Sequence, residues 1–279
     1  MLFGKSKPFD ATLGALAGED RPGALGWAFP RSLPKLLLAI VGAAASCAVL
    51  VSLSVMFIDR PVASWVHAHL GDSRFAFFTM PYDTHPLAIG PFSLMAGPAE
   101  ALHRLALFVI VMIAAAAVAG WRPTGRRRTI LVVSLTILVA VALNGEAKSA
   151  FGRTWPESWL GNNPSWVRDG VFEFAPFHGG PGFGSFPSGH TTLMTTLATL
   201  LWFVWPELRV LWVAMVAIVI TGLIGANYHF ISDVIGGVYL GVAVGLGGAQ
   251  LALSPRDRVS AALLAAAGAA SRSPAAPST

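Results

Sequence analysis

The sequence predicts an all-α protein: a six-helix transmembrane bundle with both termini in the cytoplasm. Of its 279 residues, 54% are hydrophobic and only 12% are charged, whereas soluble domains carry roughly 25% charged residues. The mean hydropathy of +0.64 is too high for a soluble domain of this size. Six apolar runs are each about as long as the ~20 residues that cross a bilayer. This composition excludes disordered, collagen-like and nucleic-acid-binding proteins.

The apolar runs divide the chain into one membrane domain with a polar segment at each end. We expect a cytoplasmic N-terminal segment at 1–33, a six-span membrane domain at 34–253 and a flexible cytoplasmic tail, rich in Ala, Ser and Pro, at 254–279. The acidic Glu19 and Asp20 do not suit a cleaved signal peptide, so the first run is expected to stay as a signal anchor. The six runs are 36–58, 102–121, 129–147, 189–205, 208–228 and 231–253.

The segments between the runs also have distinct characters. Residues 60–101 are mixed, and within them 87–95 is too short to span and is expected at the membrane interface. A basic turn at 122–128 ends the second run, and a polar, aromatic loop fills 148–187. The single cysteine, Cys47, lies in an apolar run and is expected to be a small core residue, which excludes a disulfide within the chain.

The basic residues indicate the orientation. With the N-terminus inside, 13 of the 19 Lys and Arg residues fall in cytoplasmic segments, including the run Arg126–Arg128. Positive charge favours the cytoplasmic side, so six spans with both termini inside are predicted. We interpret Arg126–Arg128 as a topology anchor; a lipid-headgroup or nucleic-acid site is the alternative.

Three polar clusters interrupt the apolar background, and this topology places all three at the outer face. The first is 148–156, the second is 186–191 and the third is 227–233. Ionisable groups at membrane depth are costly and are therefore candidates for function. Three clusters on one face are less easily explained by chance than any one alone.

The second cluster contains Pro187, Ser188, Gly189 and His190, which read as a helix start with Ser188 as N-cap. A capped transmembrane helix would explain this pattern without any function. A helix N-terminus also binds anions, and Gly189 allows an anion to approach the backbone. His190 in the first turn is placed to transfer a proton.

In the third cluster, His229 and Asp233 are four residues apart, so on a helix they would face the same side. A carboxylate that holds one imidazole nitrogen leaves the other as a nucleophile or base. A satisfied interfacial His–Asp pair is the alternative. A metal site is a weaker one, because no further ligand is placed by spacing.

In the first cluster, Lys148 and Arg153 flank Gly152 just outside a span. Snorkelling cations would explain them. Beside a helix N-terminus and two histidines, they also suit a clamp for phosphoryl oxygens.

Taken together, Lys148 with Arg153, the Pro-Ser-Gly-His run ending at His190, and His229 with Asp233 resemble the signature of the type 2 phosphatidic acid phosphatase superfamily. That family includes bacterial acid phosphatases and vanadium haloperoxidases, and the resemblance covers about residues 100–250. It implies a six-span membrane enzyme that hydrolyses a phosphate ester without a metal or other cofactor.

The resemblance also implies roles for individual residues. His229 would attack phosphorus and form a phosphohistidine, with Asp233 orienting it, and His190 would protonate the leaving oxygen. Phosphate would be bound by Lys148, Ser188 and the N–H of Gly189.

The sequence departs from the family pattern at two positions that usually carry arginine. Trp155 stands in the first motif and Leu223 in the third. We expect Arg153, two residues before Trp155, to be the main guanidinium in the pocket. Asn227 is a possible additional donor, and Arg168 is the alternative guanidinium.

The sequence thus predicts an inner-membrane lipid phosphatase whose site faces the periplasm or exterior. Its partners would be the bilayer and a lipid phosphate or pyrophosphate, with no nucleic acid. A lipid phosphotransferase with the same histidine chemistry is the alternative, and a lipid-binding or transport relative without activity is a further one. The glycines of the last run, at 236, 237, 241 and 245, predict close helix packing.

Overall fold

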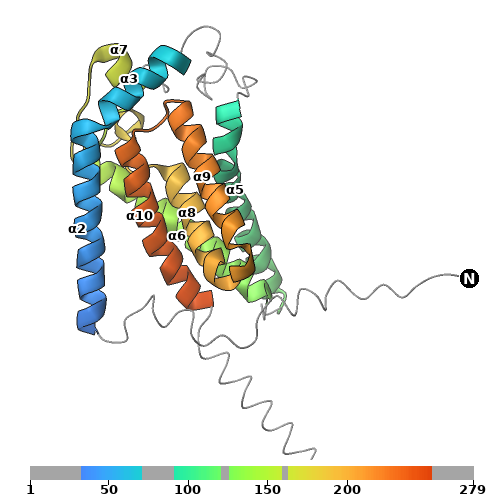
Figure 1. The fold of residues 1–279 in the computed structure, drawn as a ribbon. Helices are drawn as coiled ribbons and strands as arrows, with labels where there is room; N and C mark the ends of the chain where they lie inside the picture. Colours follow the sequence, from blue (N-terminus) through green and yellow to red (C-terminus); the bar gives the residue numbers. More distant parts are fainter. Residues whose placement is uncertain (1–32, 71–90, 121–125, 159–162, 253–279) are drawn as a thin grey trace, which may run out of the picture.

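The computed structural model describes residues 33–70, 91–120, 126–158 and 163–252, and the fold discussed below is that of these residues (Figure 1). Every named element in them is helical, which confirms the all-α class. The long helices are α2 (Leu33–Phe57), α3 (Asp59–Leu70), α5 (Pro91–Val118), α6 (Arg126–Phe151), α8 (Gly189–Val204), α9 (Arg209–Gly225) and α10 (Ile231–Ala252). The short ones are α7 (Trp166–Asp169), η1 (Pro181–Phe183) and η2 (Pro206–Leu208).

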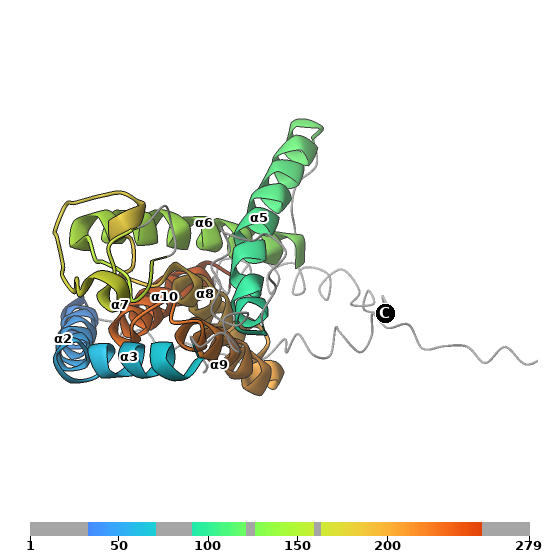
Figure 2. The same ribbon diagram turned by 90° about the horizontal axis from the view of Figure 1, so that it is seen from above.

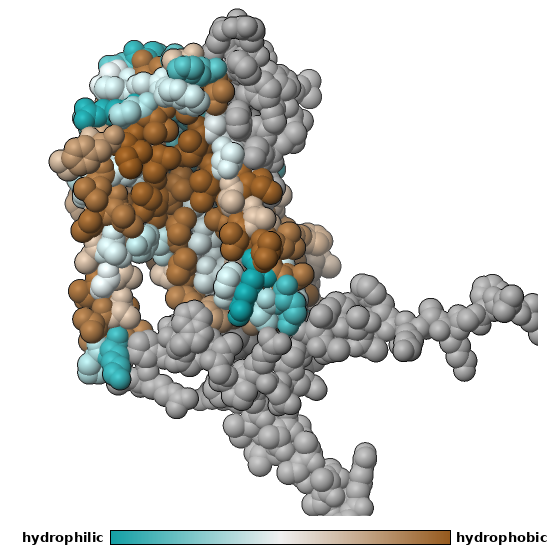
Figure 3. All heavy atoms as spheres, in the orientation of Figure 1, coloured by the Kyte–Doolittle hydropathy of each residue, from teal (hydrophilic) through white to brown (hydrophobic). Residues whose placement is uncertain are grey.

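Within the described residues, five helical segments are long and apolar enough to cross a membrane. They are Leu33–Phe57, Ala101–Val118, Arg127–Phe151, Pro206–Gly225 and Ile231–Ala252. Figure 3 shows apolar side chains covering the middle of one face, with hydrophilic residues above and below. These five correspond to five of the six predicted runs, so a multi-pass helical membrane bundle is supported, while the six-span count stays a prediction.

The remaining run forms α8, which occupies the centre of the bundle. It has 16 residues, fewer than the ~20 of a full span. It packs against α5, α6, α9 and α10. Most of its side chains are buried, including four threonines. Because neighbouring helices surround it, α8 is shielded from lipid, and its ends are set by packing rather than by the membrane surface.

The predicted close packing along α10 is confirmed. A Cβ added to Gly237, Gly241 or Gly245 would lie only 2.7–2.8 Å from a backbone carbonyl oxygen of α8. The backbones of α8 and α10 therefore meet directly. This contact fixes the start of α8 relative to the start of α10, where the predicted chemistry lies.

The described parts of 60–101 are helical. Residues 60–70 belong to α3, which crosses the end of the bundle and contacts α7, α9 and α10 (Figure 2). From Pro91 onward, the segment 87–95 is the start of α5. Its place at the membrane interface stays a prediction. The segments 1–32 and 253–279 lie outside the described residues.

Candidate active site

The three polar clusters meet at one end of the bundle. Lys148 lies in the last turn of α6, Ser188 caps the start of α8, and Asp233 lies in the first turn of α10. The N–H of Ser188 donates to the backbone carbonyl of Asp233 at 3.0 Å. Lys148 Nζ donates to the carbonyl of Gly184, just before the second cluster, at 2.6 Å. Residues from three separate parts of the chain therefore form one site.

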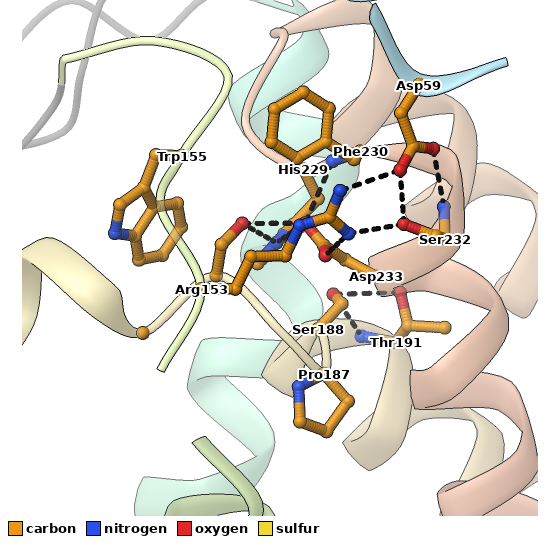
Figure 4. A network of polar contacts seen from close by, with 12 residues as sticks. Asp59, Arg153, Trp155, Pro187, Ser188, Thr191, His229, Phe230, Ser232 and Asp233 are labelled. Carbon is orange, nitrogen blue, oxygen red and sulfur yellow. Dashed lines mark hydrogen bonds and ion pairs between the residues drawn. The ribbon is translucent and has the colours of Figure 1, made fainter. Parts of the chain in front are cut away.

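His229 and Asp233 form the centre of this site (Figure 4). His229 precedes α10 and is 3% exposed. Its Nδ1 lies 3.4 Å from Asp233 Oδ2, a long hydrogen bond. The same oxygen accepts from Ser185 Oγ at 2.6 Å and from the Phe230 N–H at 2.9 Å. Burial lowers the pKa of His229 while the adjacent carboxylate opposes that shift, so the neutral, nucleophilic imidazole is favoured.

The start of α8 is built by capping. Ser188 Oγ accepts from Thr191 N at 3.4 Å and from Thr191 Oγ1 at 3.0 Å, which confirms it as the N-cap. Asn144 of α6 donates to the carbonyl of Pro187 at 3.2 Å and to Thr192 Oγ1 at 3.1 Å. The helix N-terminus, with its free N–H groups, is held in place beside the histidine.

A cavity of about 280 Å³ opens next to Lys148. Lys148 Nζ lies 5.5 Å from the ring centre of Trp155. The Trp155 ring is 5.2 Å from that of His229, and the Tyr228 ring is 5.1 Å from His229 and 5.9 Å from His190. The cavity is lined by Lys148, Ser149, Trp155, Gly179, Gly180, Pro181, Phe183, Gly184 and Tyr228.

Arg153, which we expected to bind phosphate, lies elsewhere. Like His190 and His229, it does not line the cavity, and its side chain is 1% exposed. Its Nη1 donates to Asp233 Oδ1 at 2.6 Å and to Ser232 Oγ, and its Nη2 donates to Asp59 Oδ2 at 2.7 Å. Figure 4 shows the guanidinium between the two carboxylates. Both terminal nitrogens are engaged by carboxylates, so no free fork remains for a phosphoryl group.

Gly152 determines this inward direction of Arg153. Its φ is +57°, and a Cβ there would lie 1.8 Å from the carbonyl oxygen of Ala175. Only glycine fits this turn. The rings of Phe172, Phe174 and Phe230 then lie 4.4–5.1 Å from the guanidinium carbon and enclose it.

The two additional candidates are also occupied elsewhere. Asn227, at φ +52°, donates to the carbonyl of Ala63 at 3.1 Å and to Glu157 Oε1 at 2.9 Å, so it ties α3 to the loop. Arg168 pairs with the neighbouring Asp169 at the surface, where both side chains are about one-third exposed. Arg168 does not line the cavity.

Sequence reasoning missed Asp59 and Tyr228. Asp59 is 1% exposed and accepts from Ser54 Oγ at 2.8 Å and from the Ser232 N–H at 3.0 Å. Its signal was present, because it is an acidic residue that directly follows the first apolar run. Tyr228 directly precedes the histidine, and its aromatic ring gave no sign that it would reach the cavity.

Among the residues that the structure describes, no three His, Cys, Asp or Glu side chains group in a way that could hold a metal ion. Lys148, Arg153 and the N-terminus of α8 are positive groups near His229. Independence of metals stays a prediction.

Residues 129–254 match the family model of the PAP2 superfamily. This match supports assignment of these residues to the type 2 phosphatidic acid phosphatase superfamily. Two curated proteins named lipid A 1-phosphatase are similar to it. The one from Rhizobium johnstonii is 32% identical over 112 residues, 38% of this chain and 41% of that protein. The one from Rhizobium etli is 31% identical over 112 residues, 38% of this chain and 43% of that protein. The chain thus spans about two-fifths of the length of the relatives it matches, and no solved structure matches it.

Trp155 and Leu223, which stand where the family pattern usually has arginine, lie in different surroundings. Trp155 lines the cavity and donates from Nε1 to the carbonyl of Pro181 at 2.8 Å. Leu223 is 1% exposed in an apolar cluster with Met194 and Val219, against which Tyr228 packs. A guanidinium at position 223 would enter that apolar cluster, so the departure involves the surroundings as well as the residue.

Proposed function

We propose that this protein is an integral membrane lipid phosphatase that hydrolyses a lipid phosphomonoester or pyrophosphate through a phosphohistidine. The observation that carries the proposal is the buried His229–Asp233 pair beside the capped N-terminus of α8 and Lys148. The match to the PAP2 superfamily model and the similarity to proteins named lipid A 1-phosphatase support it.

In the first step, Nε2 of His229 attacks phosphorus and the bond to the leaving oxygen breaks. Asp233 accepts from Nδ1–H, keeps the lone pair on Nε2 and stabilises the positive charge that develops on the ring. His190 gives its proton to the leaving oxygen. In the second step, water attacks the phosphohistidine while His190 takes a proton from that water, and inorganic phosphate and neutral His229 are restored.

The charge on the transferring group is stabilised by donors around the same point. We assign Lys148, the Ser188 hydroxyl and the Gly189 N–H to the phosphoryl oxygens, with the N-terminus of α8 behind them. A phosphoryl group spreads its charge over three oxygens, so several modest donors can replace one arginine. This donor set requires no metal ion.

We further propose that α2, α5, α6, α8, α9 and α10 give six membrane crossings with both termini in the cytoplasm. The described end of α6 that carries Arg127 and Arg128 lies opposite the end that carries Lys148, as the positive-inside rule favours. The site would then face the periplasm or exterior of the inner membrane.

Two other functions use the same residues. A lipid phosphotransferase would replace water by an acceptor hydroxyl in the second step. An inactive lipid-binding relative is disfavoured, because His190, His229 and Asp233 are all present. The relatives' name makes lipid A 1-phosphate the first substrate to test; phosphatidate, phosphatidylglycerophosphate, isoprenyl pyrophosphate and sphingoid phosphates follow.

The test is phosphate release by the purified protein in detergent micelles from each of these lipids, without an added acceptor. We expect one lipid class to release phosphate, and none to do so with His229→Ala. Release only after an acceptor lipid is added would favour the phosphotransferase. No turnover of any lipid under either condition, with a folded protein, would contradict both enzymatic functions.

A further inference from the structure

Asp59, Arg153 and Asp233 form a continuous buried line of charge. Arg153 Nη1 lies 2.6 Å from Asp233 Oδ1, and Nη2 lies 2.7 Å from Asp59 Oδ2. Ser232 bridges Asp59 and Arg153, since its Oγ donates to Asp59 and accepts from Arg153. All three charged side chains are at most 1% exposed. Two carboxylates thus share one guanidinium, away from water.

The two oxygens of Asp233 have separate tasks. Oδ1 is held by Arg153, while Oδ2 faces His229 Nδ1, Ser185 Oγ and the Phe230 N–H. Fixing Oδ1 therefore fixes the rotation of the carboxylate and the direction in which Oδ2 points. Arg153 in turn has its other nitrogen held by Asp59, so its plane is fixed as well.

Asp59 lies outside the residues that match the family model. It stands at the junction of α2 and α3, where Ser54 Oγ and the Ser232 N–H also hold its Oδ1. A buried ion pair by itself is weak support for a role, because such pairs often contribute little net stability. Here, however, the pair ends on the carboxylate that faces the nucleophile.

The charges also matter. Without Asp59, the positive charge of Arg153 would offset the negative charge of Asp233 and weaken the electrostatic interaction between Asp233 and His229. The negative charge of Asp59, on the far side of the guanidinium, offsets that effect. The line carries a net charge of −1 beside the histidine, the same as an unpaired Asp233, but with fixed geometry.

We propose that Asp59 and Arg153 are positioning residues that act through Asp233: they aim its carboxylate at His229 and balance its charge. Arg153 is then no phosphate ligand, and the start of α3 contributes to the active site through Asp59. This inference rests on the proposed role of His229 as nucleophile.

The test compares Asp59→Asn with Asp59→Asn/Arg153→Gln, using Asp169→Asn as the matched control at the surface. The readout is the pKa of His229, followed by nitrogen-15 NMR of labelled histidine in micelles and assigned with His229→Ala. The other charged or titratable groups around His229 are Asp233 of α10, Lys148 of α6 and His190 of α8, with Tyr228 beside it; these remain unchanged.

Asp59→Asn leaves the guanidinium charge uncompensated, so the pKa of His229 should fall by about half a unit or more. The double variant restores the net charge of −1, so the pKa should return toward that of the wild type. The turnover number should fall about 10-fold or more in both variants, because the orientation of the Asp233 carboxylate is lost in each. KM should stay within about two-fold, since neither residue touches the phosphate.

A purely structural role predicts a different pattern. Lower thermal stability with an unchanged pKa of His229 in both variants would overturn the proposal, as would a large rise in KM with unchanged turnover number for Arg153→Lys. If Asp59→Asn does not fold, Arg153→Lys provides the test alone: it keeps the charge, so it should keep the pKa and lose turnover. The NMR titration needs no substrate, so it separates failure of this inference from failure of the proposed function.

Discussion

The backbone N–H of Ser188 donates to the backbone carbonyl of Asp233 at 3.0 Å, across 45 positions of the chain. This bond joins the N-cap of α8 to the first turn of α10. The anion-binding end of one helix and the histidine–carboxylate pair of the other are therefore held in one register. Any sliding of α8 against α10 would separate the proposed phosphate site from the proposed nucleophile.

That register depends on the glycines of α10. In Gly241→Ala, the new Cβ would lie 2.7 Å from both Thr192 O and Thr195 Cβ, so the helices must move apart. We expect a loss of about 1–3 kcal/mol of stability and a lower melting temperature in detergent. Gly247→Ala on the same helix meets nothing within 4 Å and is the control, expected to be neutral or slightly stabilising. Equal melting temperatures for the two variants would contradict the packing argument.

The acidic limb of the pH–rate profile should report His229. Burial lowers its pKa below the ordinary value of about 6.5. The neutral ring is the proposed nucleophile, so activity should persist as the pH falls through 6.5 and decline only at the lowered pKa. The measurement is kcat/KM against pH for two substrates whose phosphates titrate differently. This assignment would be contradicted if the apparent pKa of the acidic limb changed with the substrate or lay above 6.5.

Removal of metal ions should leave activity intact. Lys148 and the N-terminus of α8 supply the positive charge that a metal would otherwise give. Phosphate release is therefore expected to be unchanged after dialysis against EDTA. Full loss in EDTA, restored by zinc or magnesium, would show that the donor set is incomplete.

The orientation can be tested with single cysteines in a Cys47→Ser background. Glu173→Cys, in the loop beside the site, should react with a membrane-impermeant reagent added to intact spheroplasts. Arg127→Cys, at the other end of α6, should react only after the membrane is opened. The reverse pattern would place the site in the cytoplasm.

The helices and the site centre could be predicted because their signals are local. Apolar runs predict spans, and Ser188 at a helix start predicts a cap whatever lies around it. The position of the Arg153 side chain could not be predicted, because it depends on Asp59, which is 94 residues away in the chain. Its sequence position suggested that Arg153 would lie near the expected phosphate-binding residues. The turn at Gly152 instead directs its side chain inward to two carboxylates.

Similar reasons explain the other differences. Asn227 adjoins the histidine in sequence, yet its left-handed backbone turns its amide toward Glu157 and α3. Residues 60–70 look like a mixed loop because α3 buries only one face, at Asp59, Ala63 and Val66. In each case the partner is distant in sequence, so no local pattern reveals it.

The central claim is that His229 carries the phosphoryl group. In His190→Ala the acid is missing, so a substrate with a good leaving group should still phosphorylate the protein while hydrolysis slows. The measurement is mass spectrometry of this variant after an alkaline quench, which preserves phosphohistidine. The account predicts phosphate on the peptide that contains His229, and none in His190→Ala/His229→Ala. Phosphate on another residue, or steady phosphate release by His229→Ala, would contradict it.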